Sequence, residues 1–235
     1  MREPWPIIEN ALSGTFPAEG ERFSPELLPG FSPEQLDDYS ALFSAPVPEG
    51  IKTLLLHTTG FGYYSLNEVR FDRTQGTGNI PFLPDAVLLC EDKQGVKWLA
   101  DIDTETGDWG VIYAINMRTN TCAIQANDLP GFLEQLFHTV SSKVNWLSHI
   151  REKVLPDLSS NPPSGIDMVT AGKTSDNALR AITRNLPNAA VLFDMRNAQP
   201  GDGFSWGKGH IQASAERGLF VVIPESRPFW KRWFS

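Results

Sequence analysis

The sequence predicts an α+β fold, in which helices and an antiparallel sheet occupy separate stretches of the chain. Two segments, 33–43 and 48–59, begin with a proline at the first helical position, and the second has a clear apolar helical face. Within 86–126 the apolar period changes to two, which is typical of β-strands. Helices are therefore followed by a run of strands.

Three parts are expected along the chain. Residues 1–32 are rich in Pro, Gly and Glu without a sustained period, which predicts an irregular arm. Residues 33–145 hold the helices and strands of the main domain. Residues 146–235 alternate short apolar runs with one helical segment, which indicates a small C-terminal α/β unit. A single helix of about 27 residues, from Leu129 to Pro156, is predicted to link the two, because its apolar residues recur at threes and fours.

Four strands in series are predicted within the main domain. They begin near Ala86, at Val96, at Val111 and at Cys122, with turn-rich segments between them. The second strand alternates strictly, so one of its faces should lie in the core and the other toward solvent. Short connections favour an antiparallel meander. The later strands are expected at 166–170, 189–195, 211–214 and 219–223, with a helix over 175–185.

The net charge of −8 at pH 7 is distributed unevenly. Residues 1–145 contain 20 acidic and 9 basic side chains, whereas residues 146–235 contain 8 and 11. An acidic first half repels phosphate backbones and attracts basic surfaces. We therefore expect a protein partner and no nucleic acid.

No stretch approaches the roughly 18 consecutive apolar residues of a membrane span, and the first residues lack a signal-peptide core. The two cysteines, Cys90 and Cys122, lack metal-ligand spacing and are expected in the core. These observations predict a cytoplasmic protein with no membrane span, no metal and no cofactor. The aromatic segment 228–235 is expected to dock on the chain itself or on a second copy, which would make a homodimer.

An acidic turn is the candidate binding site. Asp101, Asp103, Glu105 and Asp108 lie beside Trp109, which we expect to be exposed or half-exposed. Such a turn could anchor an Arg- or Lys-rich partner surface. The alternative interpretation is a solvated turn next to a core tryptophan. Its pattern imitates a calcium loop, but the glycine falls one position late and the closing glutamate is missing.

Motifs in the C-terminal unit favour catalysis only weakly. Ser205 lies in a G-x-S-x-G pattern, but loop precedes it and a strand is expected after it, so a nucleophile elbow is not predicted. The segment 171–174 lacks the first glycine of a phosphate-binding loop. An enzyme site within 160–235 would have to bring together His210, Lys208, Ser205 and Asp194.

The segments 36–60 and 86–137 together resemble the SUKH superfamily of bacterial toxin-immunity proteins and fungal cell-wall regulators. The first carries a proline before a helix that ends in Gly60-Phe61, as the family typically begins. The second carries a strand ending in Asp101, then Trp109-Gly110-Val111, and an acid that opens the closing helix. The family turn usually has two glycines, whereas this turn has only Gly95.

The resemblance implies an α+β domain that binds another protein and has no catalytic activity. Bacterial members commonly neutralise a toxin, in many cases one that acts on nucleic acid. The expected function is therefore that of an immunity protein against a cognate bacterial toxin. Two alternatives remain: a non-enzymatic scaffold or regulator that binds an endogenous protein, and an enzyme with its site in 160–235.

Overall fold

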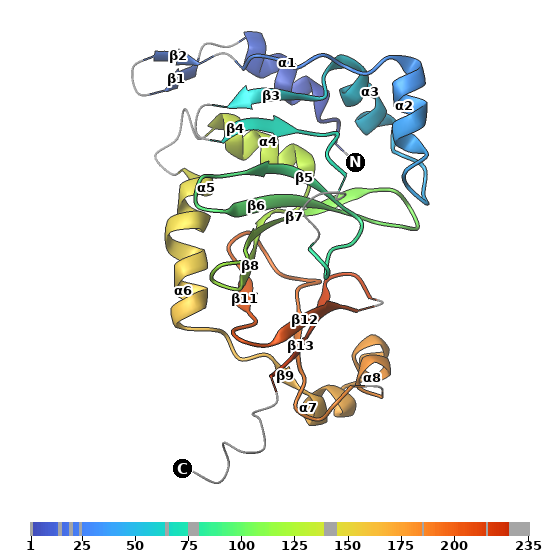
Figure 1. Ribbon diagram of the computed structural model, residues 1–235, viewed down its shortest axis with the longest axis vertical. Helices are drawn as coiled ribbons and strands as arrows, with labels where there is room; N and C mark the ends of the chain where they lie inside the picture. Colours follow the sequence, from blue (N-terminus) through green and yellow to red (C-terminus); the bar gives the residue numbers. More distant parts are fainter. Residues whose placement is uncertain are drawn as a thin grey trace.

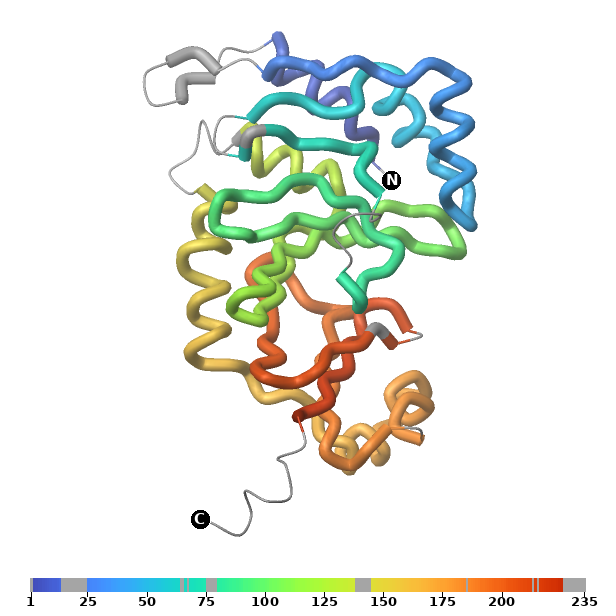
Figure 2. The backbone as a smooth tube through the Cα atoms, in the orientation of Figure 1, coloured from blue at the N-terminus to red at the C-terminus, as the bar shows by residue number. Residues whose placement is uncertain are grey.

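The computed structural model describes residues 2–225 apart from 14–15, 19–20, 24, 64–65, 75–79, 139–144, 185 and 215. It contains helices and antiparallel sheets, which confirms the α+β class (Figure 1). The chain forms successive layers, with the N-terminal helices at one end and the C-terminal strands and helices at the other (Figure 2). The aromatic segment 228–235, and with it the prediction of a homodimer, lies outside the described residues.

The prediction of an irregular N-terminal arm is wrong. Helix α1 spans Trp5–Ser13, and the short strands β1 (Phe16–Ala18) and β2 (Glu21–Phe23) pair with each other. Ile8 and Ala11, three residues apart, lie on one face of α1 and are buried in the main core. The ring of Trp5 stacks on His57 at 4.1 Å. Prolines in the first helical turn are compatible with a helix, and tertiary burial stabilises it.

The two predicted helices that follow are present. Helix α2 (Pro33–Ser40) begins with a capping box, in which Ser32 and Gln35 each accept a hydrogen bond from the other's backbone N–H. Helix α3 (Glu49–His57) buries one apolar face in the core. A hairpin of β3 (Gly60–Tyr63) and β4 (Asn67–Arg70) comes next.

The predicted meander forms most of a five-stranded antiparallel sheet. The sheet has the order β11-β8-β7-β6-β5, so the four consecutive strands are neighbours as expected. Their bounds are Ala86–Glu91 for β5, Val96–Ile102 for β6, Trp109–Asn116 for β7 and Thr121–Ala126 for β8. The fifth strand, β11 (Gly203–Ser205), comes from the C-terminal part and pairs with β8.

Both faces of this sheet are buried, so the prediction of one solvent face is wrong. Trp98 and Ala100 of β6 belong to the core beneath the helices, which include α4 (Leu129–His138). Leu99, on the opposite face, belongs to a second core with Phe204 and Phe220 from the C-terminal part. The alternation of β6 is real, but a second layer covers the face expected to be polar.

The C-terminal part adds that second layer. A four-stranded antiparallel sheet has the order β12-β13-β10-β9, with bounds His210–Ala213, Leu219–Ile223, Val191–Asp194 and Ile166–Asp167. In β13, Phe220 and Val222 belong to the core shared with the five-stranded sheet, and Leu219 and Val221 to the core under α7 and α8. The described residues between 146 and 225 are therefore packed into one layered structure with the main domain and contribute a strand to its sheet.

Two short helices cover the outer face of the second sheet. Helix α7 (Met168–Lys173) occupies most of the segment predicted as a strand, and α8 (Asn177–Thr183) occupies the predicted helix. The change from strand to helix occurs at Asp167, whose carboxylate accepts the backbone N–H of Thr170 at 2.9 Å. This N-cap outweighs the β-branched residues that follow it.

The long linking helix is interrupted, so this prediction is wrong as well. After α4 ends at His138, a new helical run begins at α5 (Trp146–His149) and continues through the π-helical turn η2 (Ile150–Val154) and α6 (Leu155–Ser160). Asn145 has extended backbone angles and caps this run by accepting the N–H of Ser148 at 2.9 Å. The wider π turn ends two residues before Pro156, which has no N–H to donate, and the helix continues through the proline. Across the described residues, none of the helices has the length and apolar character needed to cross a membrane.

Candidate acidic binding groove

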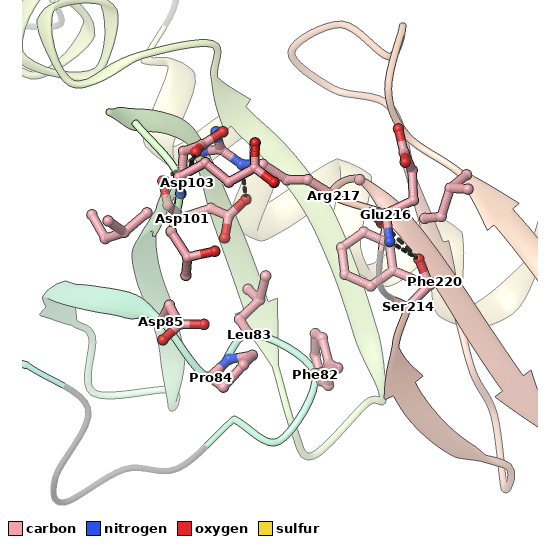
Figure 3. Close-up of a pocket in the computed structure, with 15 residues that line it drawn as sticks. Phe82, Leu83, Pro84, Asp85, Asp101, Asp103, Ser214, Glu216, Arg217 and Phe220 are labelled. Atoms are coloured by element: carbon pink, nitrogen blue, oxygen red, sulfur yellow. Dashed lines mark hydrogen bonds and ion pairs between the residues drawn. The ribbon is translucent and has the colours of Figure 1, made fainter. Parts of the chain in front are cut away.

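A pocket of about 310 Å³ opens where turns from the two sheets approach each other. The end of β6 and the β6–β7 turn supply Asp101, Asp103 and Glu105, and the β12–β13 turn supplies Glu216 and Arg217. The segment 82–85, which leads into β5, completes the lining with Phe82, Leu83, Pro84 and Asp85. In Figure 3, Arg217 extends across from the second sheet toward Asp101 and Asp103.

Arg217 is held by a well-defined set of acceptors. Its Nε donates to Asp101 Oδ2 at 2.6 Å, one Nη donates to the Asp101 carbonyl at 2.7 Å, and the other donates to Asp103 Oδ2 at 3.3 Å. The guanidinium also lies against Gly110, where a Cβ would collide with it. These acceptors match the planar fork of an arginine side chain. The interaction joins the C-terminal layer to the main sheet.

The two aspartates have opposite electrostatic environments. Burial raises the pKa of Asp101, whose side chain is 11% exposed, although Arg217 acts against this shift. The backbone N–H groups of Thr106 and Glu105 lower the pKa of Asp103 by donating to its carboxylate. Burial also works against the charge of Arg217, but the carboxylates outweigh it and raise its pKa. The groove therefore contains a buried aspartate that is paired with an arginine.

Three further carboxylates around the pocket remain available. Asp85, Glu105 and Glu216 are exposed, and within the described part of the chain no ion pair reaches them. The five carboxylates of the pocket face a single guanidinium, so the pocket has a strongly negative potential. The chemistry available here is recognition of a cation.

A smaller pocket of about 190 Å³ adjoins the first. The two share Asp85 and the segment 102–104, and the smaller one continues to Leu42 and Phe43 in the turn after α2. Together they form what we call the acidic groove, and both are lined by carboxylates and by apolar side chains.

The structure brings together only part of the predicted site. Asp101, Asp103 and Glu105 line the groove, whereas Asp108 does not. Trp109 is 1% exposed and belongs to the main core, so the expectation of an exposed or half-exposed tryptophan is wrong. Ile102 and Trp109 are partners in the β6–β7 ladder, and the adjoining layers cover this end of the hairpin.

Three residues of the groove were missed by the sequence reasoning. Asp85, Glu216 and Arg217 belong to no motif, and they are distant in sequence from the acidic turn. The only signal was the excess of bases in residues 146–235, which was not interpreted as a sign that the two parts pair with each other. It did not indicate which arginine would meet which acid.

Two of the four residues proposed for an alternative enzyme site, Asp194 and Ser205, have partners outside such a site. Asp194 forms an ion pair with Arg196 at 2.6 Å, and Ser205 Oγ donates to the Asn120 carbonyl at 3.0 Å. The chain continues from Ser205 through a turn into strand β12, as the sequence predicted. The segment 171–173 lies in helix α7, not in a phosphate-binding loop. Among the described residues, no group of His, Cys, Asp and Glu could hold a metal ion.

The fold and this groove define the chain as an α+β protein with an acidic groove. None of the family models, curated proteins or solved structures with which it was compared matches it.

Proposed function

We propose that this chain is a non-catalytic immunity protein, which binds a basic protein toxin through the acidic groove and thereby blocks it. The observation that carries the proposal is the pocket in which five carboxylates face one guanidinium. The resemblance of residues 33–140 to the SUKH superfamily supplies the class of partner. Both a toxin that acts on nucleic acid and a basic regulator surface would present the cations that this groove favours.

The way in which Arg217 binds indicates how a partner would be held. Asp101 and Asp103 already accept a guanidinium in a forked arrangement, so the groove is shaped for arginine. A partner cation would use the carboxylates that remain exposed, those of Asp85, Glu105 and Glu216. Complementary charge of this kind accelerates association and selects the partner, while shape complementarity over a wider surface supplies most of the affinity.

The test is capture of the partner by the tagged protein, followed by binding measurements with a groove variant. The groove variant removes three charges without changing size: Asp85→Asn, Glu105→Gln and Glu216→Gln. Each exposed pair contributes roughly 0.2–1 kcal/mol, so the variant should bind about tenfold more weakly. A matched control removes three charges from exposed acids outside the groove: Glu9→Gln, Glu91→Gln and Glu225→Gln.

The identity of the captured protein separates the two non-enzymatic candidates. A basic toxin that loses affinity for the groove variant, but not for the control, supports immunity. An endogenous housekeeping protein with the same behaviour would instead assign the groove to a scaffold or regulator. Equal loss in the groove variant and the control would refute the groove as the binding site, because only overall charge would then matter.

A further inference from the structure

We infer that a second pocket binds an arginine side chain of a partner protein, and that Arg2 of this chain occupies the same carboxylates until it is displaced. The pocket has a volume of about 510 Å³. It is lined by Arg2, by residues between 126 and 135 around the start of α4, by Trp146 of α5 and by Pro200. None of these residues lines the acidic groove, so the site goes beyond the proposed function.

The side chain of Arg2 shows which chemical group this pocket holds. One Nη donates to Glu134 Oε1 at 2.8 Å, and the other donates to Asp128 Oδ1 at 3.2 Å. A guanidinium therefore already lies between the two carboxylates of the pocket. It is held weakly, because the Arg2 side chain is 55% exposed and exposed ion pairs contribute little. Another guanidinium that makes further contacts can therefore replace it.

Trp146 supplies such a further contact. It is 37% exposed although it lines the pocket, so part of the indole is available to a ligand. The His149 ring packs edge-on against it at 5.5 Å, and Asn145 caps the helix that carries it by accepting the N–H of Ser148. The face of an indole attracts a guanidinium, which can stack flat on it. An arginine from a partner gains this stacking in addition to the two carboxylates.

The charges of the pocket favour an arginine within a polypeptide over a free arginine molecule. Once Arg2 has left, the described lining contains the carboxylates of Asp128 and Glu134 and no cation. The carboxylate of free arginine would then lie in a negative potential without a partner, whereas an arginine in a peptide lacks that charge. Lysine is disfavoured for another reason, because its ammonium group lacks the planar surface that stacks on an indole.

NMR titration of the labelled full chain with N-acetyl-arginine N-methylamide tests the site, with the Gly131 N–H and the Trp146 indole N–H as reporters. Arg2→Ala should bind this probe about fivefold more tightly than the wild type, because the competing guanidinium is gone. Arg118→Ala removes another exposed cation and is the matched control, which should not change the affinity. N-acetyl-lysine N-methylamide and free arginine should each bind Arg2→Ala about fivefold more weakly than the arginine probe.

Further variants in the Arg2→Ala background separate the indole from the carboxylates, with Gly131 as the reporter. Trp146→Leu should weaken the arginine probe about fivefold, and Trp146→Phe, which keeps an aromatic face, should weaken it less. Glu134→Gln should also weaken it about fivefold. The triple groove variant should leave this affinity unchanged at moderate salt, because its substitutions lie at the other site.

The site is refuted if Arg2→Ala binds the arginine probe no more tightly than the wild type and Arg118→Ala. It is equally refuted if the lysine probe or free arginine binds as well as the arginine probe, or if Trp146→Leu retains full affinity. Loss of the Gly131 response in the triple groove variant would assign the binding to the acidic groove instead. If the captured partner binds the triple groove variant normally while Arg2→Ala gains affinity for the probe, the proposed function fails and this site stands.

Discussion

Replacing Arg217 by Met should destabilise the protein, because it leaves Asp101 buried without its counter-charge. Arg217 makes two of its hydrogen bonds to the side chain and carbonyl of Asp101 and a third to Asp103. Methionine retains much of the aliphatic volume but makes none of these hydrogen bonds. The variant therefore tests the charge rather than the packing.

The expected cost follows from the burial of the two partners. Removing one partner of a fully buried pair costs roughly 3–5 kcal/mol. The Asp101 side chain is 11% exposed, but that of Arg217 is 37% exposed, so water can enter when the guanidinium is removed. We therefore expect a loss of about 2 kcal/mol in the free energy of unfolding at neutral pH.

The cost should depend on pH in a defined direction. Burial already raises the pKa of Asp101, and removing Arg217 eliminates an influence that lowers it. In the variant the folded-state pKa of Asp101 rises further above its unfolded value, so stability falls as pH increases between the two values. Below the unfolded value Asp101 is protonated in both states. The difference between variant and wild type should therefore be small in acid and largest at neutral pH.

Urea unfolding monitored by tryptophan fluorescence across this pH range is the appropriate assay. A loss of about 2 kcal/mol corresponds to a midpoint lower by about 0.7 M. Arg118→Met, on an exposed turn, is the control and should change little. Adding Asp101→Asn to Arg217→Met should recover part of the loss, because no uncompensated charge then remains. A loss below about 0.5 kcal/mol, or one that does not vary with pH, would refute the reasoning.

Two further substitutions test neighbouring contacts. Gly110→Ala should displace the guanidinium of Arg217, because this group lies against Gly110. In urea unfolding, the double variant with Arg217→Met should therefore lose little more free energy of unfolding than either single variant. Fully additive losses would contradict this contact. Trp98→Phe removes the donor that meets the buried Gln125 Oε1 at 2.8 Å, and should cost about 1–3 kcal/mol in the same assay. Gln125→Leu alone should also be destabilising, and a Trp98→Phe variant as stable as wild type would show that water replaces the lost donor.

The meander could be predicted because the information lies within the segment itself. In β6, strict alternation places Trp98 and Ala100 on one face, and turn-forming residues bracket the strand. These local signals specify that the segment is a strand and which strands are its neighbours. They do not say what covers Leu99 and Asp101, because the covering layer is contributed by residues about a hundred positions later, such as Phe204 and Phe220.

Local sequence signals likewise predicted only part of the helices and part of the site. The apolar spacing from Leu129 onward is real, but Asn145 has a side chain that can accept from the backbone, and that local cap interrupts the run. In the acidic turn, the sequence predicted four carboxylates that could anchor a basic partner, and three of them line the groove. Trp109 was placed wrongly because a residue at a strand start has no periodic neighbours that indicate its burial.

The contrast between an acidic first part and a basic second part has a structural explanation that charge counting alone could not supply. Asp92 and Asp101 are the buried carboxylates of the described chain, and each faces an arginine from the C-terminal part. Asp92 lies 3.8 Å from Arg151, and Asp101 lies 2.6 Å from Arg217. The C-terminal bases thus neutralise the acids that the layers bury, and the acids left at the surface of the groove have no such partner within the described chain. A negative surface at the groove is therefore what remains after each of the two buried carboxylates has been placed beside an arginine.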